Sequence, residues 1–422
     1  MSAYLSKFES LCKDIMRFEQ CLLPLCAAEN VMSPFAKIPL DTSLQEKYIM
    51  GGVQGLETNS NFAEAKYLFP FYDLIKEQCQ NLFHCAYADP RALSGVNAVM
   101  LLLMSLFDEG DTLLISSEDS GGHSSMPLIC KRLGISTIEM PYNYDKMDFD
   151  YDVLNQILAK GNINGILICP SDLLWQPHLE NVCLPQSCIL IYDATQTLGL
   201  IGGRANRNPL DYFTDTDNVI LMGATHKTIP GPTCGLIMTK NLELACQFDS
   251  TINPDYLRNV QFHHILSLSL ALMEIETFGE SYGRNIINNA NYLGCCLEDI
   301  GIEVIQKENG VYTETHQLFL PIPPDEVNNF ANRCDSCGLS LNVRNKRLYR
   351  GSGVRLGLQE VTRYGWQETE MKQIADILFK IKNAKDLTCL LKSIQLLAKN
   401  KSIQYSFDKK TIDRIYASLH NC

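Results

Sequence analysis

The hydrophobic residues in the central part of the chain fall into short continuous runs. These runs cover residues 111–116, 165–170, 188–194, 218–223 and 234–238. Between several of them, or leading into them, apolar residues recur at helical spacing, as in 99–107, 126–133 and 151–159. Continuous apolar strands separated by helices indicate a mostly parallel sheet that helices cover on both faces. The pattern therefore predicts an α/β fold.

Helical spacing also marks the regions on either side of this alternation. Apolar residues lie on one helix face from the start of the chain until Pro24 ends the pattern, and 71–83 is amphipathic as well. A long helical stretch at 262–299 follows the last strand. Beyond it, the pattern predicts shorter strands and helices at 303–305, 317–321, 325–334 and 387–422.

These changes of pattern suggest a division of the chain into three parts. We expect an N-terminal helical arm at 1–30 and a large domain at 31–260 that contains the parallel sheet. The third part, 261–422, is expected to hold a connector helix and a smaller C-terminal α/β domain.

The composition argues against several classes of protein. Of the 422 residues, 46% are hydrophobic and 20% charged, as in an ordinary globular protein, and the net charge of −12 argues against a nucleic-acid surface. The longest apolar run, 99–107, is too short to span a bilayer, and the charged, amphipathic start does not resemble a signal peptide. We expect a cytoplasmic protein with no nucleic-acid or membrane partner.

The seventeen cysteines are spread through apolar segments of a long chain. Without a signal peptide, this distribution indicates reduced and mostly buried thiols rather than disulfides. One C-x-x-C pair, Cys334 and Cys337, lacks the further ligands that a zinc site needs. No metal site is expected.

Polar side chains follow the ends of the predicted strands, where ligands bind in open parallel sheets. Ser171 follows 165–170, Asp193 lies near the end of 188–194, and Lys227 comes shortly after 218–223. Lysine is almost never fully buried unless it is paired, so Lys227 is either an ordinary loop lysine or a nucleophile. Asp193 is either a turn or cap residue or the acid partner of a pyridine nitrogen.

Two further segments carry candidate cofactor ligands. Ser94 and Gly95 precede an apolar helix, where they serve either as a plain N-cap or as the start of a phosphate site at the helix N-terminus. His123 follows two glycines and is either a structural histidine or a ring that stacks on a planar cofactor. A lysine, an acid and an anion site are what pyridoxal phosphate (PLP) requires from its protein.

The order of these segments along the chain resembles that of fold-type I PLP enzymes, and within them the serine hydroxymethyltransferase family. The stretch THKTIPGPTCG is similar to the family's lysine motif THKT-x-x-GP-x-GG. SSEDSGGHSS resembles its GGH segment, YDATQTLGLI its VD-x-AH-x-x-GL segment, GVRLGLQEVTRYG its arginine motif, and AAEN its ASEN. These matches run from about residue 27 to residue 365.

The resemblance implies a fold, a cofactor and a set of residue roles. The fold is a mostly parallel central sheet covered by helices plus a smaller C-terminal α/β domain, the cofactor is PLP, and the assembly is a homodimer. Lys227 is the Schiff-base lysine, Asp193 the pyridinium partner and His123 the stacking ring. Further cofactor contacts are implied for Ser94, Gly95, Ser171, Gln196, Thr225 and His226.

Substrate contacts are implied as well. Arg363 resembles the arginine that holds the substrate α-carboxylate through a bidentate pair, with Arg355 as the alternative. Tyr48 resembles the tyrosine that reaches the partner subunit's active site, and Glu29 in AAEN is a candidate catalytic carboxylate. The small-molecule partners are an amino acid and an aldehyde.

Departures from the family pattern limit the reaction. Met50 stands where the family has its catalytic glutamate, Ala28 replaces a serine, and Gln196 replaces a histidine that contacts the cofactor oxygen. The family's YPG-x-RYYGG stretch is absent as well. Methionine cannot move a proton, so acid–base work at this position requires another group, for which Glu57 is a candidate.

We therefore expect aldol-type transfer or cleavage on a β-hydroxy-α-amino acid, through an external aldimine and a glycyl quinonoid. The pattern is most similar to the threonine transaldolase and α-methylserine hydroxymethyltransferase branch. The alternatives are a hydroxymethyltransferase for an α-substituted or unusual amino acid, an oxygen-using PLP decarboxylase or oxidase, and a cofactor-binding protein without activity.

Overall fold

The computed structural model describes residues 3–53, 62–307, 310–384 and 387–420. The chain divides into two compact units. The sheet unit comprises Ala28–Arg284 and Tyr405–Cys422, and the terminal unit comprises Met1–Ala27 and Asn285–Gln404. The division into three parts at residues 30 and 260 stays a prediction.

A seven-stranded sheet forms the centre of the sheet unit, and its strands lie in the order β2-β10-β9-β8-β7-β3-β4. The strands are β2 (Tyr87–Ala92), β3 (Thr112–Ile115), β4 (Ser136–Glu139), β7 (Gly165–Ile168), β8 (Ile189–Asp193), β9 (Val219–Ala224) and β10 (Gly235–Thr239). Strands β9, β8, β7, β3 and β4 are parallel, whereas β10 is antiparallel to both of its neighbours. The α/β fold with a mostly parallel sheet is confirmed.

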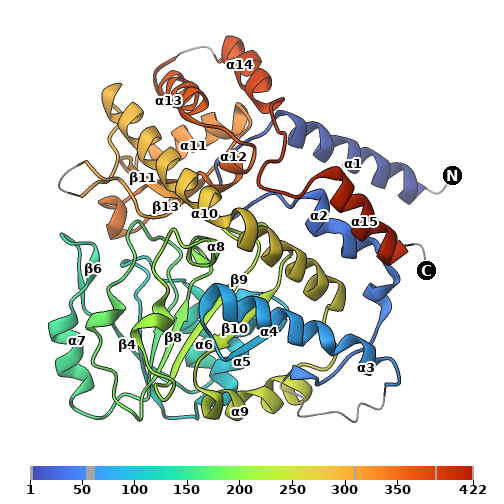
Figure 1. Ribbon diagram of the computed structural model, residues 1–422. Helices are drawn as coiled ribbons and strands as arrows, with labels where there is room; N and C mark the ends of the chain where they lie inside the picture. The colour runs from blue at the N-terminus through green and yellow to red at the C-terminus, as the bar shows by residue number, and fades with distance from the viewer. Residues whose placement is uncertain (1–2, 54–61, 308–309, 385–386, 421–422) are drawn as a thin grey trace. The chain divides into compact units, whose positions relative to one another are not determined.

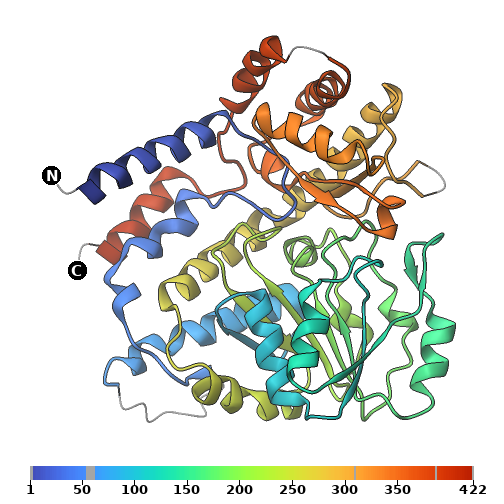
Figure 2. The same cartoon turned by 180° about the vertical axis from the view of Figure 1, so that it is seen from behind.

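Helices cover both faces of this sheet. They are α4 (Pro70–Phe83), α5 (Gly95–Leu106), α6 (Ser125–Arg132), α7 (Tyr151–Leu158), α8 (Leu198–Gly202), α9 (Leu242–Ser250) and α10 (Phe262–Asp299). Figures 1 and 2, seen from opposite sides, show α4 on one face and α5 and α6 on the other. Because both faces are covered, β7, β9 and β10 are buried along their whole length, as the continuous apolar runs predicted.

Shorter elements complete the sheet unit. They are the helices α2 (Pro34–Lys37), α3 (Ala65–Leu68) and α15 (Lys409–His420) and the strand pair β5 (Tyr142–Asn143) with β6 (Asp148–Phe149). Residues of α15 and the loop before it pack on Phe35, Ile38 and Leu270. Helix α15 therefore belongs to this unit, although it lies far from the rest of the unit in sequence.

The terminal unit contains a second, smaller sheet of three antiparallel strands in the order β11-β14-β13. Its elements are α1 (Ala3–Cys21), β1 (Leu23–Pro24), β11 (Gln317–Pro321), α11 (Val327–Ser336), β12 (Leu339–Ser340), β13 (Asn342–Arg344), β14 (Gly353–Gly357), α12 (Gln359–Arg363), α13 (Glu368–Asn383) and α14 (Thr388–Ala398). The strand expected at 303–305 is wrong. That segment is irregular and keeps one ladder-like bond, from the Ile305 N–H to the Phe319 carbonyl at 2.9 Å.

Membrane spans, metal sites and disulfides are absent from the described residues. None of the described helices is long and apolar enough to cross a membrane. The same residues contain no group of three or more His, Cys, Asp or Glu side chains arranged to hold a metal ion. The cysteines that the structure describes carry free thiols, and most of those in the sheet unit are buried.

Candidate active site

The candidate site lies where two neighbouring parallel strands end. Asp193 is the last residue of β8 and pairs in register with Met222 of β9. Strand β9 continues to Ala224, and the turn with Thr225, His226 and Lys227 follows it directly. Because the carboxyl ends of parallel strands meet at one edge, the carboxylate and the lysine are brought to the same edge of the sheet.

The electrostatics of Asp193 connect it to two other predicted site residues. Its side chain is buried, and the Thr195 N–H donates to Oδ1 at 2.8 Å. Burial raises the pKa of Asp193, while hydrogen bonds from Thr195 and the charges of Lys227 and His123 lower it. The structure therefore brings Asp193, Lys227 and His123 close enough for their charges to interact.

Hydrogen bonds fix the turn on both sides of Lys227. Before the lysine, the Thr225 hydroxyl donates to the Pro232 carbonyl at 2.7 Å, so it holds the turn together. After it, the Thr228 hydroxyl donates to the Gln196 carbonyl at 3.0 Å and accepts from the Gly199 N–H at 3.0 Å. Both threonines thus anchor the backbone, and the segment with Gln196 is tied to the lysine turn.

His226 is the one residue of the turn with an unsatisfied ring nitrogen. Its Nδ1 is buried and has no hydrogen-bond partner among the residues that the structure describes. Burial and the charge of Lys227 lower the pKa of His226 to about 4. The imidazole is therefore neutral near pH 7, and Nδ1 is available to a bound group.

Close packing holds the His123 loop against the ends of β3 and β7. A Cβ at Gly122 would lie 2.2 Å from the Ser116 carbonyl oxygen, so only glycine fits there. The His123 N–H donates to the Cys169 carbonyl at 2.8 Å, and the Ser171 N–H donates to the Gly121 carbonyl at 2.8 Å. These bonds place both His123 and Ser171 at the carboxyl edge of the sheet.

Helix α5 begins at the same edge. Ser94 is its N-cap, and its Oγ accepts the Asn97 N–H at 3.2 Å. A Cβ at Gly95 would lie 3.0 Å from Ala224 Cβ and 3.1 Å from Thr195 Oγ1. The helix start therefore lies against the residues that flank Asp193 and Lys227, and its first N–H groups, which have no partner within a helix, form a natural anion site.

The other predicted residues of the sheet unit come earlier in the sequence than Ser94. Glu29 is exposed and precedes Asn30, whose amide donates to the Lys227 carbonyl. The Tyr48 ring is 42% exposed and stacks on Phe62, with ring centroids 4.7 Å apart. Met50 is partly buried, and Glu57 lies outside the described residues.

Both candidate arginines belong to the terminal unit, where each is buried. Arg355 lies in β14, and its Nη2 donates to Asn342 Oδ1 at 2.9 Å, on the neighbouring strand. Arg363 ends helix α12, and its backbone carbonyl accepts the Gln404 N–H at 2.8 Å. The guanidinium of Arg355 thus has a structural partner in its own sheet.

The sequence is similar to those of known proteins over most of its length. A family model described as serine hydroxymethyltransferase matches residues 6–378, which is most of the chain. The chain belongs to the serine hydroxymethyltransferase family. The serine hydroxymethyltransferase of Methanocella arvoryzae is 28% identical over 408 residues, covering 92% of both chains. That of Thermoplasma volcanium is 30% identical over 369 residues, covering 84% of both.

A solved structure shares the fold. The crystal structure of L-threonine transaldolase from Pseudomonas fluorescens, in its internal aldimine state, is similar with a TM-score of 0.91. The similarity covers 99% of this chain and 97% of that one at 22% sequence identity. The fold-type I architecture expected from the sequence is confirmed.

As a member of the serine hydroxymethyltransferase family, the protein is a PLP-dependent transferase with PLP as its cofactor. The residues of the sheet unit fit this group. A planar, anionic ring compound suits an edge with a buried carboxylate, a lysine, an unsatisfied imidazole nitrogen on His226 and the N-terminus of α5.

Sequence reasoning missed three residues that organise this edge. Thr195 binds Asp193 and, through Oγ1, accepts the Ala224 N–H at 2.8 Å. Thr228 ties the lysine turn to Gln196, and Asn30 contacts the Lys227 carbonyl. The D-x-T spacing of Asp193 and Thr195 is a recognisable turn signal. Nothing in the sequence marks the long-range bond of Asn30.

Proposed function

We propose that the protein catalyses aldol-type transfer or cleavage on a β-hydroxy-α-amino acid, of the threonine transaldolase or aldolase type. The proposal is supported by Asp193, Lys227 and His123 at one edge of the sheet, together with Met50 at the position where the resemblance implies a catalytic glutamate. The fold also accommodates such chemistry, since the solved structure that shares it is an L-threonine transaldolase.

The residues of the sheet unit divide the work of holding the cofactor. Asp193 would keep a proton on the ring nitrogen, and its burial makes this charge-assisted bond strong. Ser94, Gly95 and the start of α5 would bind the phosphate, His123 would stack on the ring, and Lys227 would hold the cofactor through its amine. PLP, when bound, supplies an electron sink for the α-carbon of the amino acid.

Substrate handling requires a carboxylate clamp and a base. Arg363 would hold the α-carboxylate in a bidentate pair, which fixes orientation as well as position. Cleavage of the Cα–Cβ bond requires removal of the β-hydroxyl proton. Met50 cannot accept that proton, so Glu29 and His123 are the groups proposed for this step.

The active assembly is proposed to be a homodimer in which Tyr48 serves the partner's site. Helix α1 supports this assignment, because none of its 19 residues is buried, and Phe8, Leu11 and Ile15 are 64%, 59% and 53% exposed. An apolar helix face of this kind indicates a protein interface, and a second copy of the chain would cover it. Sedimentation of the wild type and of Phe8→Asp tests this point, with a monomeric wild type as the contrary result.

The reaction is tested by incubating the PLP-loaded protein with L-threonine or L-serine, with and without tetrahydrofolate. We expect acetaldehyde release from threonine at a rate that tetrahydrofolate does not change. Serine turnover that depends on tetrahydrofolate would instead assign a hydroxymethyltransferase. No aldehyde from either amino acid would reject aldol chemistry on these two amino acids.

A further inference from the structure

Asn30 makes a set of contacts that connects the start of the sheet unit to the lysine turn. Its Nδ2 donates to the Lys227 carbonyl and to Tyr282 Oη, the latter at 3.0 Å, and its Oδ1 accepts the Val31 N–H at 2.8 Å. The orientation of the amide follows from chemistry, because a backbone carbonyl can only accept a hydrogen bond and must face the NH2 group.

The Lys227 carbonyl lies between two anchored residues. Thr225 is fixed by its bond to Pro232, and Thr228 by its bonds to Gln196 and Gly199. Asn30 binds the peptide group between them, from a position 197 residues away in the sequence. The contact therefore completes the anchoring of the turn at the residue whose side chain carries the chemistry.

The second acceptor of Asn30 is itself well fixed. Tyr282 lies on the long helix α10, is buried, and packs its ring against Tyr405 with centroids 5.1 Å apart. A donor that bridges this tyrosine and the Lys227 carbonyl links the backbone of the lysine turn to a rigid helix.

We propose that Asn30 is a positioning residue that sets the place of the Lys227 amine relative to Asp193 and the cofactor. The proposal rests on the proposed role of Lys227 as the cofactor lysine. A reacting group must be held within a fraction of an ångström of its productive place, and a displacement of about 1 Å can cost about 10²-fold in rate. The two amide donors of Asn30, rather than its acceptor, supply this constraint.

The donors and the acceptor can be separated by substitution. Asn30→Asp keeps an acceptor for the Val31 N–H but has no NH2 group for Lys227 and Tyr282. Asn30→Ala removes both, and Tyr282→Phe removes the helix acceptor while it keeps the whole amide of Asn30. The matched control is Asn155→Ala on α7, because Asn155 also bridges two backbone groups, the Asn181 carbonyl at 2.8 Å and the Cys183 N–H at 2.9 Å.

Each variant is loaded with PLP and followed by three measurements. These are the pH midpoint of the visible absorbance of the bound cofactor, the cofactor dissociation constant, and kcat with KM for the amino acid. We expect Asn30→Asp and Asn30→Ala to shift the midpoint alike and to lower kcat about ten-fold with little change in KM. Tyr282→Phe should act in the same direction but more weakly, and Asn155→Ala should lower only the melting temperature.

A purely structural role for Asn30 predicts a different result. The Asp variant would then recover the wild-type midpoint and kcat, because it retains the bond to Val31, and this outcome would overturn the proposal. If Asn30→Ala does not fold, an unchanged midpoint and kcat in Tyr282→Phe and Asn30→Asp overturns it equally. The role of Lys227 is checked separately, since a visible band that persists in Lys227→Ala would reject the cofactor lysine and the positioning role with it.

Discussion

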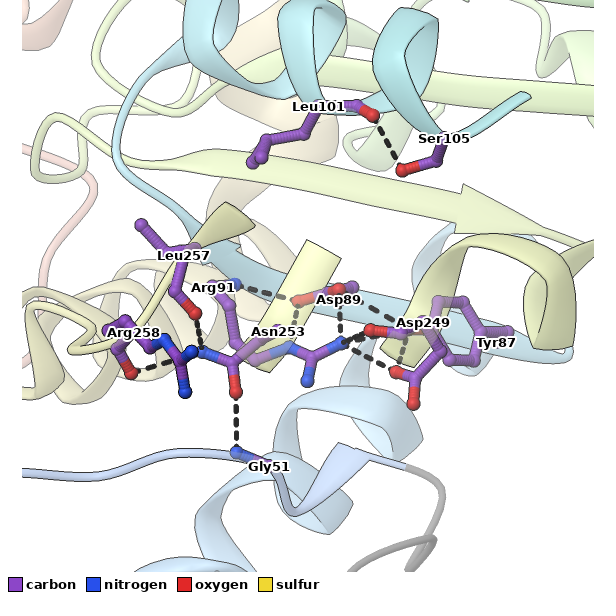
Figure 3. A network of polar contacts seen from close by, with 10 residues as sticks. All are labelled: Gly51, Tyr87, Asp89, Arg91, Leu101, Ser105, Asp249, Asn253, Leu257 and Arg258. Carbon is purple, nitrogen blue, oxygen red and sulfur yellow. Dashed lines mark hydrogen bonds and ion pairs between the residues drawn. The ribbon is translucent and has the colours of Figure 1, made fainter. Parts of the chain in front are cut away.

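The sheet unit contains two buried carboxylate centres with opposite designs. One lies on the edge strand β2, where Arg91 is enclosed by Asp89, Asp249 and Tyr87 (Figure 3). The other is Asp193 at the end of β8, separated from β2 by the strands β10 and β9. In the first centre a cation and two carboxylates bond to one another, whereas the carboxylate of Asp193 is bonded by Thr195 and not by a cation.

The charges of the β2 centre are matched by short, directed bonds. Arg91 Nε and Nη2 donate to the two oxygens of Asp89 at 2.9 and 2.7 Å, and Nη2 also contacts Asp249 Oδ1 at 2.5 Å. The Tyr87 hydroxyl donates to Asp249 at 2.6 Å. Burial alone would lower the pKa of Arg91, but Asp89, Tyr87 and Asp249 raise it well above its usual value. This centre joins β2 to α9.

The Asp193 centre differs in its bonds. Burial raises the pKa of Asp193, as it also raises the pKa of Asp249, but among the described residues Asp193 accepts its hydrogen bonds from Thr195 and not from a cationic side chain. Buried charges without full compensation destabilise a fold and concentrate at functional sites. The difference between the two centres therefore distinguishes a structural ion pair from a binding site.

The largest effect is expected from Arg91→Met. The substitution leaves Asp89 and Asp249 buried without a cation, and removal of one partner of a buried ion pair costs about 3–5 kcal/mol. Urea unfolding of the apoprotein measures the loss. Asp249→Asn is the matched control with a smaller loss, because Arg91 keeps Asp89. A change below about 1 kcal/mol in Arg91→Met would contradict the structural role of this centre.

Asp193→Asn is expected to lower turnover without lowering the stability of the apoprotein, in contrast to Arg91→Met. The amide keeps an acceptor for the Thr195 N–H and removes a charge that burial disfavours, so the apoprotein should be no less stable than the wild type. Turnover of the PLP-loaded variant should fall by about 10²–10³-fold, as when one preorganised electrostatic group is lost. Unfolding and threonine turnover, measured on the same preparation, check both parts. A clear loss of stability would instead indicate that Asp193 has a structural role, as Arg91 does in the β2 centre.

The inner strands of the sheet could be predicted from the sequence, whereas the edge strands could not. The inner strands β3, β7, β8 and β9 were found because both faces are buried and the apolar runs are continuous. The edge strands were missed. Strand β4 is exposed along its length, and β2 contains Asp89 and Arg91. The burial of Asp89 and Arg91 depends on Asp249, which lies 158 positions away from Arg91 in the sequence. No local sequence pattern reveals such a partner.

Local sequence patterns likewise reveal some residues of the candidate site and not others. Lys227, Asp193, His123 and Gly95 could be placed because each lies at a strand end or helix start, and such positions are visible in a local pattern. The Thr225 hydroxyl holds the turn, which the sequence did not reveal, and its assignment to the cofactor stays a prediction. Its bond to Pro232 depends on the conformation of the turn, which spacing alone does not fix. The contact of Asn30 with Lys227 is of the same long-range kind as that of Arg91 with Asp249.

The smallest effect concerns the pH dependence that His226 contributes. Its pKa in the folded protein is lowered to about 4, whereas an unfolded histidine has a pKa of about 6.5. The unfolded state therefore binds the proton more readily, so this contribution to stability is complete above about pH 6.5 and is lost as the pH falls toward 4. In the β2 centre, Arg91 stays charged throughout this range.

The variant His226→Gln isolates this contribution, because glutamine fills a similar space and does not titrate. Between pH 7 and pH 5 the apoprotein should lose about 1–2 kcal/mol more stability as the wild type than as the variant. Urea unfolding at both pH values, for both proteins, gives the difference, and contributions common to the two cancel. Equal losses would mean that His226 is as well solvated in the fold as in the unfolded chain. The imidazole of His226 would then be protonated at mildly acid pH.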